Sequence, residues 1–141
     1  MDPEKCLRNT NLTCHLMILV VDDTPAFRKI ASKVLEYHGY EVITAENGLV
    51  ALKIATEFNP DLIVMDVRMP IMDGLEATRA IRALGGKMSV IPIIGYSSQD
   101  DDPEQKECIK AGMTEFVSKC WGVEHLATRV DDLAHAYKTI H

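Results

Sequence analysis

The chain has 141 residues, a length that suits one domain with a single sizeable core. Hydrophobic residues make up 47% of it, as in an ordinary globular protein, and a net charge of −6 argues against a nucleic-acid-binding surface, which needs clustered Lys and Arg. No apolar stretch approaches the ~18–20 residues that span a bilayer, and none of the four cysteines is in a CxxC pair, so we expect a cytoplasmic protein with reduced thiols.

Five short apolar stretches predict buried strands, and the segments after them have apolar residues at helical spacing. The strands are expected at 17–21, 40–45, 61–66, 90–97 and 114–118. The helices are expected around 27–35, 50–55, 75–84, from 102 onward, and 123–137. In the helix that opens at Asp102 and Pro103, Gln105 is placed for a capping box.

The alternation of strands and helices predicts an α/β fold. Strands that are apolar at successive positions are buried on both faces, as in a parallel sheet covered by helices. Because parallel crossovers are almost always right-handed, the helices should divide between the two faces of the sheet. We expect one domain over 16–141. Residues 1–15 lack the apolar region of a signal peptide and are expected to form a mobile N-terminal arm.

Polar residues stand where the predicted strands end. Asp22 and Asp23 follow the first strand, Asp66 ends the third, Ser97 the fourth, and Lys119 follows the fifth. In such a sheet these ends share one edge, where ligands bind. Two carboxylates about 4 Å apart repel by ~4 kcal/mol at an effective dielectric of about 20. A hard divalent cation offsets that repulsion, so the pattern indicates a Mg²⁺ site beside an aspartate able to act as a phosphoryl acceptor.

Four motifs together carry a resemblance to a known family. "VVDD", "MDVRMPIMDG", "PIIGYSS" and "EFVSK" occur in this order, each at the end of a predicted strand. With their separations they resemble the receiver domain of two-component response regulators, over about residues 16–140. The resemblance implies a flavodoxin-like, doubly wound, five-stranded parallel sheet in the order 2-1-3-4-5 with five helices.

The resemblance also implies a Mg²⁺ site with named ligands. Asp66 would be the phosphorylated aspartate and a metal ligand. Asp23 would bind the metal directly, Asp22 mainly through water, and the main-chain carbonyl of Arg68 would complete the protein ligands. The Arg68 side chain, a long cation at the mouth of the pocket, could meet the phosphoryl group or restrict access to it.

Three further residues take roles by the same resemblance. Ser97 would hydrogen-bond the phosphoryl group, although a slip of one residue would place Ser98 there. Lys119 would pair with the phosphoryl group, unless it is a solvated surface charge. Phe116 would be the aromatic whose rotamer follows phosphorylation, with plain core packing as its competing interpretation. Asp73 is expected to be the N-cap of the third helix rather than a site residue.

One position departs from the family pattern. Cys120 follows Lys119 where the family usually has proline, which makes a cis peptide inexpensive. We therefore expect a trans bond between Lys119 and Cys120, with the Lys119 amine less firmly placed.

The expected function is a phosphorylation-dependent signalling switch rather than an enzyme. A histidine kinase or histidine phosphotransfer protein would donate a phosphoryl group to Asp66 with Mg²⁺. We expect no effector domain beyond residue 141 and therefore output through a downstream protein partner or a relay, with no nucleic acid or membrane partner. The alternative is a receiver domain excised from a hybrid histidine kinase. A phosphatase of the haloacid dehalogenase type would need a second acid where Arg68 stands. A receiver that works without phosphorylation is disfavoured because all the acids are present.

Overall fold

The computed structural model describes residues 16–99 and 101–140, so the expectation for the arm at 1–15 lies outside it. Its strands are β1 (Met17–Val21), β2 (Glu41–Ala45), β3 (Leu62–Asp66), β4 (Ile93–Ser97) and β5 (Glu115–Ser118). Its α-helices are α2 (Pro25–Tyr37), α3 (Gly48–Phe58), α4 (Gly74–Ala83), α5 (Asp102–Ala111) and α6 (Val123–Ile140), and two short 3₁₀ helices cover Gly86–Ser89 and Lys119–Trp121. Among these described helices, none is both long and apolar enough to cross a membrane.

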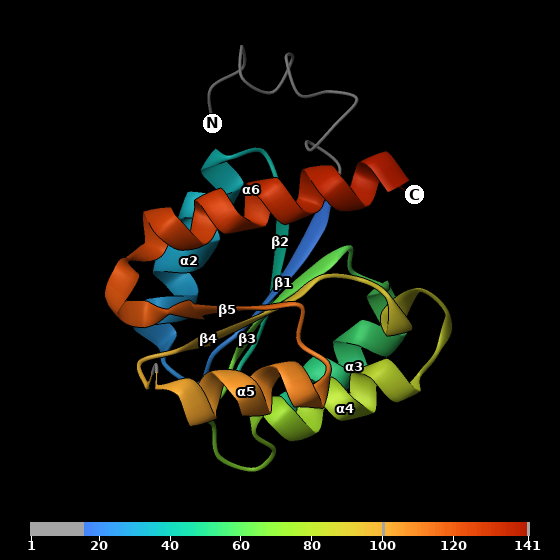
Figure 1. Cartoon of the computed structure of the whole chain (residues 1–141). Helices are drawn as coiled ribbons and strands as arrows, with labels where there is room; N and C mark the ends of the chain where they lie inside the picture. Colours follow the sequence, from blue (N-terminus) through green and yellow to red (C-terminus); the bar gives the residue numbers. More distant parts are fainter. Residues whose placement is uncertain (1–15, 100, 141) are drawn as a thin grey trace.

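The five strands form one parallel sheet in the order β2-β1-β3-β4-β5, which confirms the predicted fold (Figure 1). The register places Val21 opposite Ala45, Asp66 opposite Tyr96, and Ser97 opposite Ser118. The carboxyl ends of the strands therefore meet at one edge, as the sequence predicted.

The helices cover both faces of the sheet, with α2 and α6 on one side and α3, α4 and α5 on the other (Figure 1). Side chains of β1 alternate between the two buried clusters: Ile18 and Val20 face one, and Leu19 and Val21 face the other. Successive residues of a strand point to opposite faces, so burial on both faces requires an unbroken apolar run. This is why β1 and β3 read as continuous hydrophobic segments.

Two local predictions were wrong by a few residues. The strand expected at 90–97 begins only at Ile93, because the chain first makes a 3₁₀ turn and Pro92 has no N–H for the ladder. The cap of α5 is Asp101, whose carboxylate accepts from the main-chain N–H of Glu104. The third residue after this N-cap, which is the second position of a capping box, is therefore Glu104, and the expected Gln105 lies one residue beyond it.

Gly74 sets how close α4 comes to the end of β3. Its N–H donates to the Val67 carbonyl at 2.9 Å. A Cβ atom at Gly74 would collide with the Asp66 carbonyl oxygen and lie 2.9 Å from the Val67 Cα. Both obstacles are main-chain atoms, which cannot rotate away. Glycine is needed here so that the first turn of α4 can sit against the strand end that carries Asp66.

We expect Gly74→Ala to lower the free energy of unfolding by about 3 kcal/mol, because the added methyl group overpacks rigid backbone. Urea denaturation followed by circular dichroism would measure it. Gly86→Ala is the control: Gly86 has a φ of 56° and no atom near its Cβ position, so only the left-handed backbone costs energy, about 1 kcal/mol. Equal losses in the two variants would contradict the steric explanation.

Candidate functional site

Three carboxylates gather where β1 and β3 end. Asp22 and Asp66 are buried, with 2% and 4% of their surface exposed, and Asp23 beside them faces solvent. One oxygen from each lies within 4.8 Å of one from each of the others. All three ligand atoms are carboxylate oxygens, which fits a hard divalent cation such as Mg²⁺. The structure thus brings together the three acids that the sequence predicted.

Local hydrogen bonds fix the position of Asp22. Its N–H donates to the Ala45 carbonyl at 3.1 Å, which extends the β1–β2 ladder by one residue. Its carboxylate accepts from the Thr24 N–H at 2.8 Å, and its carbonyl accepts from the Arg28 guanidinium at 2.7 Å. Both the main chain and the side chain of Asp22 are therefore held in place, whereas Asp23 is exposed to solvent.

Lys119 supplies a positive charge inside the acidic cluster. Its Nζ lies 3.0 Å from Asp22 Oδ2 and 3.4 Å from Asp66 Oδ2, and only 12% of its side chain is exposed. The ammonium also lies 4.4 Å from the centroid of the Phe27 ring and 5.5 Å from that of Tyr96. A solvated surface charge would have none of these contacts, so Lys119 belongs to the site. The two aromatic rings were not foreseen from the sequence.

The chain turns after Lys119 without the proline typical of the family. All peptide bonds of the described residues are trans, so the expected trans bond between Lys119 and Cys120 is confirmed. Cys120 has an N–H that proline lacks, and it donates to Ser118 Oγ at 3.1 Å. The expected loosening of Lys119 is not observed, because its ammonium reaches both buried carboxylates.

The electrostatics of the cluster are dominated by Asp66. Burial and, after it, the negative charge of Asp22 raise the pKa of Asp66 from 3.8 to about 7, while Lys119 and the Arg68 N–H oppose the rise. The Arg68 N–H donates to Asp66 Oδ1 at 3.3 Å. One ammonium does not fully compensate the acids, so the site retains an attraction for additional positive charge.

Ser97 lies at the end of β4 and is buried, whereas Ser98 is exposed. The Ser97 Oγ accepts from the Gln99 N–H at 3.1 Å and lies 3.4 Å from Glu104 Oε2, to which it donates. The Arg68 guanidinium binds the same Glu104 through two hydrogen bonds, of 2.6 and 3.2 Å. Neither of the two possibilities raised for the Arg68 side chain anticipated this acidic partner, and the capping position of α5 was expected at Gln105, one residue after Glu104.

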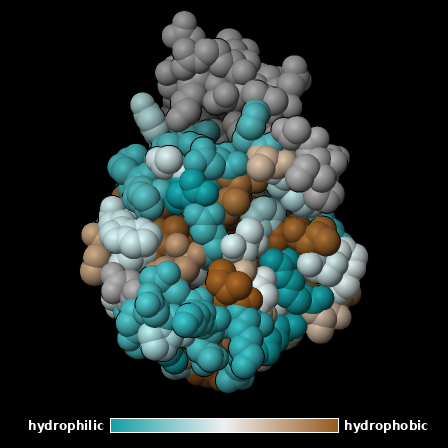
Figure 2. Space-filling view, in the orientation of Figure 1, coloured by the Kyte–Doolittle hydropathy of each residue, from teal (hydrophilic) through white to brown (hydrophobic). Residues whose placement is uncertain are grey.

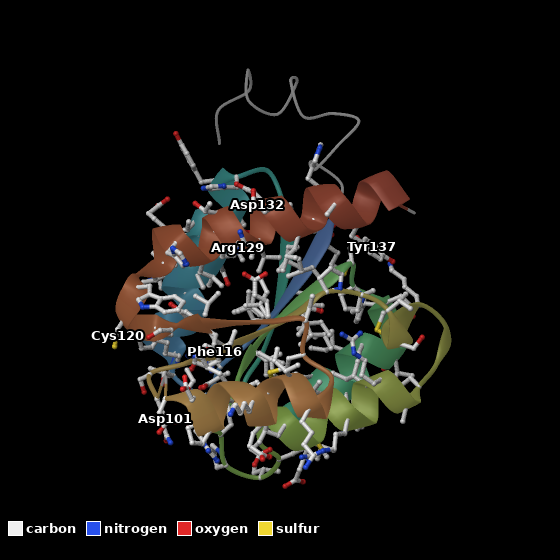
Figure 3. The ribbon with its side chains drawn as sticks, in the orientation of Figure 1. Asp101, Phe116, Cys120, Arg129, Asp132 and Tyr137 are labelled. Atoms are coloured by element: carbon white, nitrogen blue, oxygen red, sulfur yellow. The ribbon has the colours of Figure 1, made fainter. Side chains whose placement is uncertain are left out.

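A cavity of about 450 Å³ opens at this edge of the sheet. The described residues that line it are Asp23, Thr24, Phe27, Asp66, Arg68, Ser97, Ser98, Lys119 and Cys120. Figure 3 shows Cys120 and Asp101 at this end of the molecule, and Phe116 lies back from it, nearer the start of β5. Phe116 is buried in the cluster beneath α3, α4 and α5, and is not among the lining residues. Asp73 caps α4 by accepting from the Glu76 N–H at 2.9 Å, so its expected role as N-cap is confirmed.

Comparison with known proteins places these features in a family context. The model of the response regulator receiver domain family matches residues 18–131. The CAI-1 autoinducer sensor kinase/phosphatase CqsS of Vibrio cholerae is 43% identical over 103 residues, which are 72% of this chain and 15% of that protein. The response regulator MprA of Mycobacterium sp. (strain KMS) is 35% identical over 113 residues, or 80% of this chain and 48% of MprA. The chain spans about half or less of the length of these relatives.

Solved structures agree with the fold. The chemotaxis protein CheY4 of Vibrio cholerae has a TM-score of 0.80 and 30% identity, and the match covers 84% of this chain and 98% of CheY4. The receiver domain of the sensor histidine kinase PA1611 of Pseudomonas aeruginosa has a TM-score of 0.78 and 29% identity, and the match covers 85% of this chain and 98% of that one. The latter structure has a magnesium ion coordinated in its active site cleft.

We expect the charge on Asp66 to make the fold less stable as the pH rises. The pKa of this group is about 7 when folded and near 3.8 when unfolded, so its stabilising protonation is lost as pH rises through 7. Asp66→Asn removes this dependence. In metal-free buffer the variant should gain about 3 kcal/mol relative to the wild type between pH 5 and pH 8.

Urea denaturation of both proteins at several pH values would measure the difference, and the titrating groups that lie away from the cluster cancel in the comparison. Parallel stability curves for the two proteins would show that burial does not shift the pKa of Asp66.

Proposed function

Because the chain belongs to the response regulator receiver domain family, we propose that it accepts a phosphoryl group on Asp66 in a two-component signalling pathway. The donor is a histidine kinase or a histidine phosphotransfer protein. The observation that carries the proposal is the arrangement of Asp66, Asp22 and Lys119, two buried carboxylates that share one ammonium at an open cavity. Receiver domains are signalling switches, and we place this one in the cytoplasm.

The chain's own residues supply most of what phosphoryl transfer needs. An Asp66 carboxylate oxygen attacks the phosphorus of the donor phosphohistidine, the P–N bond breaks, and its electron pair remains on the imidazole nitrogen. Lys119 lies close enough to neutralise charge on the transferring oxygens. Asp22, Asp23, Asp66 and the Arg68 carbonyl would hold Mg²⁺. When bound, Mg²⁺ would further offset the charge of the phosphoryl oxygens.

Output would follow from the charge added at Asp66. Ser97 would turn toward the phosphoryl group, and repacking near Phe116 would shift the population of surfaces formed by α5, β5 and α6. This side of the molecule is seen in Figure 2, where hydrophobic residues are scattered among hydrophilic ones. Ile109 on α5 and Trp121 after β5 are each about half exposed. A protein partner is therefore a better fit for output than nucleic acid, which an acidic chain repels.

A second candidate function is favoured by the similarity to sensor kinases. Besides CqsS, the sensor histidine kinase RcsC of Escherichia coli is 35% identical over 122 residues, 84% of this chain but only 12% of RcsC. The chain could therefore act as the receiver segment of a hybrid histidine kinase, with the phosphoryl group relayed onward. The gene sequence on either side of the chain would separate the two candidates.

Incubation with acetyl phosphate and Mg²⁺ should add the mass of one phosphoryl group to the wild type and none to Asp66→Asn. The variant lacks the nucleophile but keeps the fold, because it also removes one repelling charge. Intact-mass spectrometry would show the result.

Asp73→Asn is the matched control for this experiment. Asp73 lies in the same loop region and caps α4, a role that asparagine retains. It should be phosphorylated like the wild type. Phosphorylation of Asp66→Asn at the wild-type rate would show that Asp66 is not the acceptor.

Millimolar Mg²⁺ at fixed ionic strength should raise the melting temperature of the wild type by mass action. At ten times its Kd the ion would add about 1.4 kcal/mol of stability. Asp23→Asn should reduce the effect, because it removes one ligand without creating a buried defect. Asp102→Asn, which removes an exposed acid outside the cluster, should keep it. An equal response of all three proteins would argue against this metal site.

A further inference from the structure

A half-buried ion pair joins the loop after β3 to the first turn of α5. Arg68, two residues after Asp66, binds both oxygens of Glu104, with Nη2 at 2.6 Å from Oε1 and Nε at 3.2 Å from Oε2. The Glu104 side chain is completely buried, whereas 56% of the Arg68 side chain is exposed. The only ion pair that the structure gives this carboxylate, within the described chain, is therefore with a partner at the mouth of the phosphoacceptor cavity.

Glu104 also holds Ser97. The Ser97 hydroxyl lies 3.4 Å from the same Oε2 that accepts from Arg68. The two polar side chains that flank Asp66 on this side of the cavity thus both face Glu104. The Arg68 N–H also donates to the carboxylate of Asp66, so the Arg68 side chain branches from a main-chain position next to the proposed phosphoacceptor.

A phosphoryl group on Asp66 would compete with Glu104 for these two side chains. It carries about two negative charges and three strong acceptor oxygens, against the single charge of a carboxylate. Arginine pairs with phosphate oxygens in the same forked geometry that it uses here with Glu104. A carboxylate that loses its counter-ion while buried is strongly destabilised. Glu104 would then be driven toward water, and opening of the first turn of α5 would bring it there.

We propose that Glu104 is a positioning residue that holds Arg68 and Ser97 in the resting state and is displaced when Asp66 is phosphorylated. It slows phosphorylation, and it transmits the new charge to the N-terminus of α5. This inference rests on the proposed phosphoacceptor function of Asp66.

The cap of α5 provides a local reporter. Asp101, which Figure 3 shows at the start of this helix, accepts from the Glu104 N–H at 2.9 Å through its carboxylate and from the Gln105 N–H at 3.1 Å through its carbonyl. Opening of the first turn would break both bonds. The two amide hydrogens should therefore exchange faster with solvent when Glu104 is displaced.

The test compares Glu104→Gln with the wild type and with Glu107→Gln, which removes the same charge from an exposed position of the same helix. Acetyl phosphate with Mg²⁺ serves as the donor, intact mass gives the phosphorylation rate, and NMR gives amide exchange. Glu104→Gln should be phosphorylated about fivefold faster, which corresponds to about 1 kcal/mol. Phosphorylation should speed exchange at residues 104 and 105 in the wild type and in Glu107→Gln. It should not do so in Glu104→Gln, because an uncharged amide can stay buried.

Wild-type phosphorylation rates and exchange changes in Glu104→Gln would overturn the inference and leave the proposed function standing. A wild type that takes no phosphoryl group would overturn the proposed function and the inference with it. Should Glu104→Gln fail to fold, Arg68→Gln tests the same link from the other partner. It strips Glu104 of its counter-ion, so exchange at residues 104 and 105 should already be faster without phosphorylation. Unchanged exchange would overturn the inference.

Discussion

The site depends on an unequal charge balance at the edge of the sheet. Asp22 and Asp66 are both buried, and a single ammonium, that of Lys119, lies between them. The β1–β3 pairing brings the two acids together, and β5 delivers the lysine from the far side of β4. The arrangement is stable enough to fold yet under-neutralised. The remaining negative charge of the site therefore attracts a metal cation, either alone or together with a phosphoryl group.

This imbalance explains why function and stability oppose each other here. Burial and the nearby Asp22 raise the pKa of Asp66 to about 7, so ionising the carboxylate that we propose as the phosphoacceptor lowers the stability of the fold. A Mg²⁺ ion would favour that ionised form. Strain of this kind at a reactive group is common where chemistry occurs. The two apolar clusters on either side of the sheet supply the stability that offsets this cost.

The sequence was sufficient wherever one rule decided the outcome. Apolar runs gave the strands, and the direction of parallel strands put Asp22, Asp66 and Lys119 at a common edge. What it could not provide were contacts that depend on exact placement between elements. The pairing of Arg68 with Glu104 requires knowing which face of α5 turns inward, and the expected capping position, Gln105, was one residue away from Glu104.

The turn after Lys119 shows the same limit. Because Cys120 replaces the proline of the family, the sequence suggested that Lys119 would be less firmly placed. The sequence does not show which contact takes over the role of the proline. The substitute is a hydrogen bond from the Cys120 N–H to Ser118 Oγ, a side chain that was assigned only to a strand. Short polar residues next to a turn can replace the geometric role of proline in this way.

The close packing of Gly74 gives the site a stiff side and a compliant side. On the α4 side the helix starts directly against the carbonyl of Asp66, and no side chain separates the two backbones. On the α5 side the contact is made by long side chains, Arg68 and Glu104, that can rotate. A displacement that begins at Asp66 is therefore resisted by main-chain contacts on the α4 side, whereas on the α5 side rotating side chains can transmit it. This difference in stiffness depends on the absence of a Cβ atom at Gly74, and it would favour movement of α5 over movement of α4.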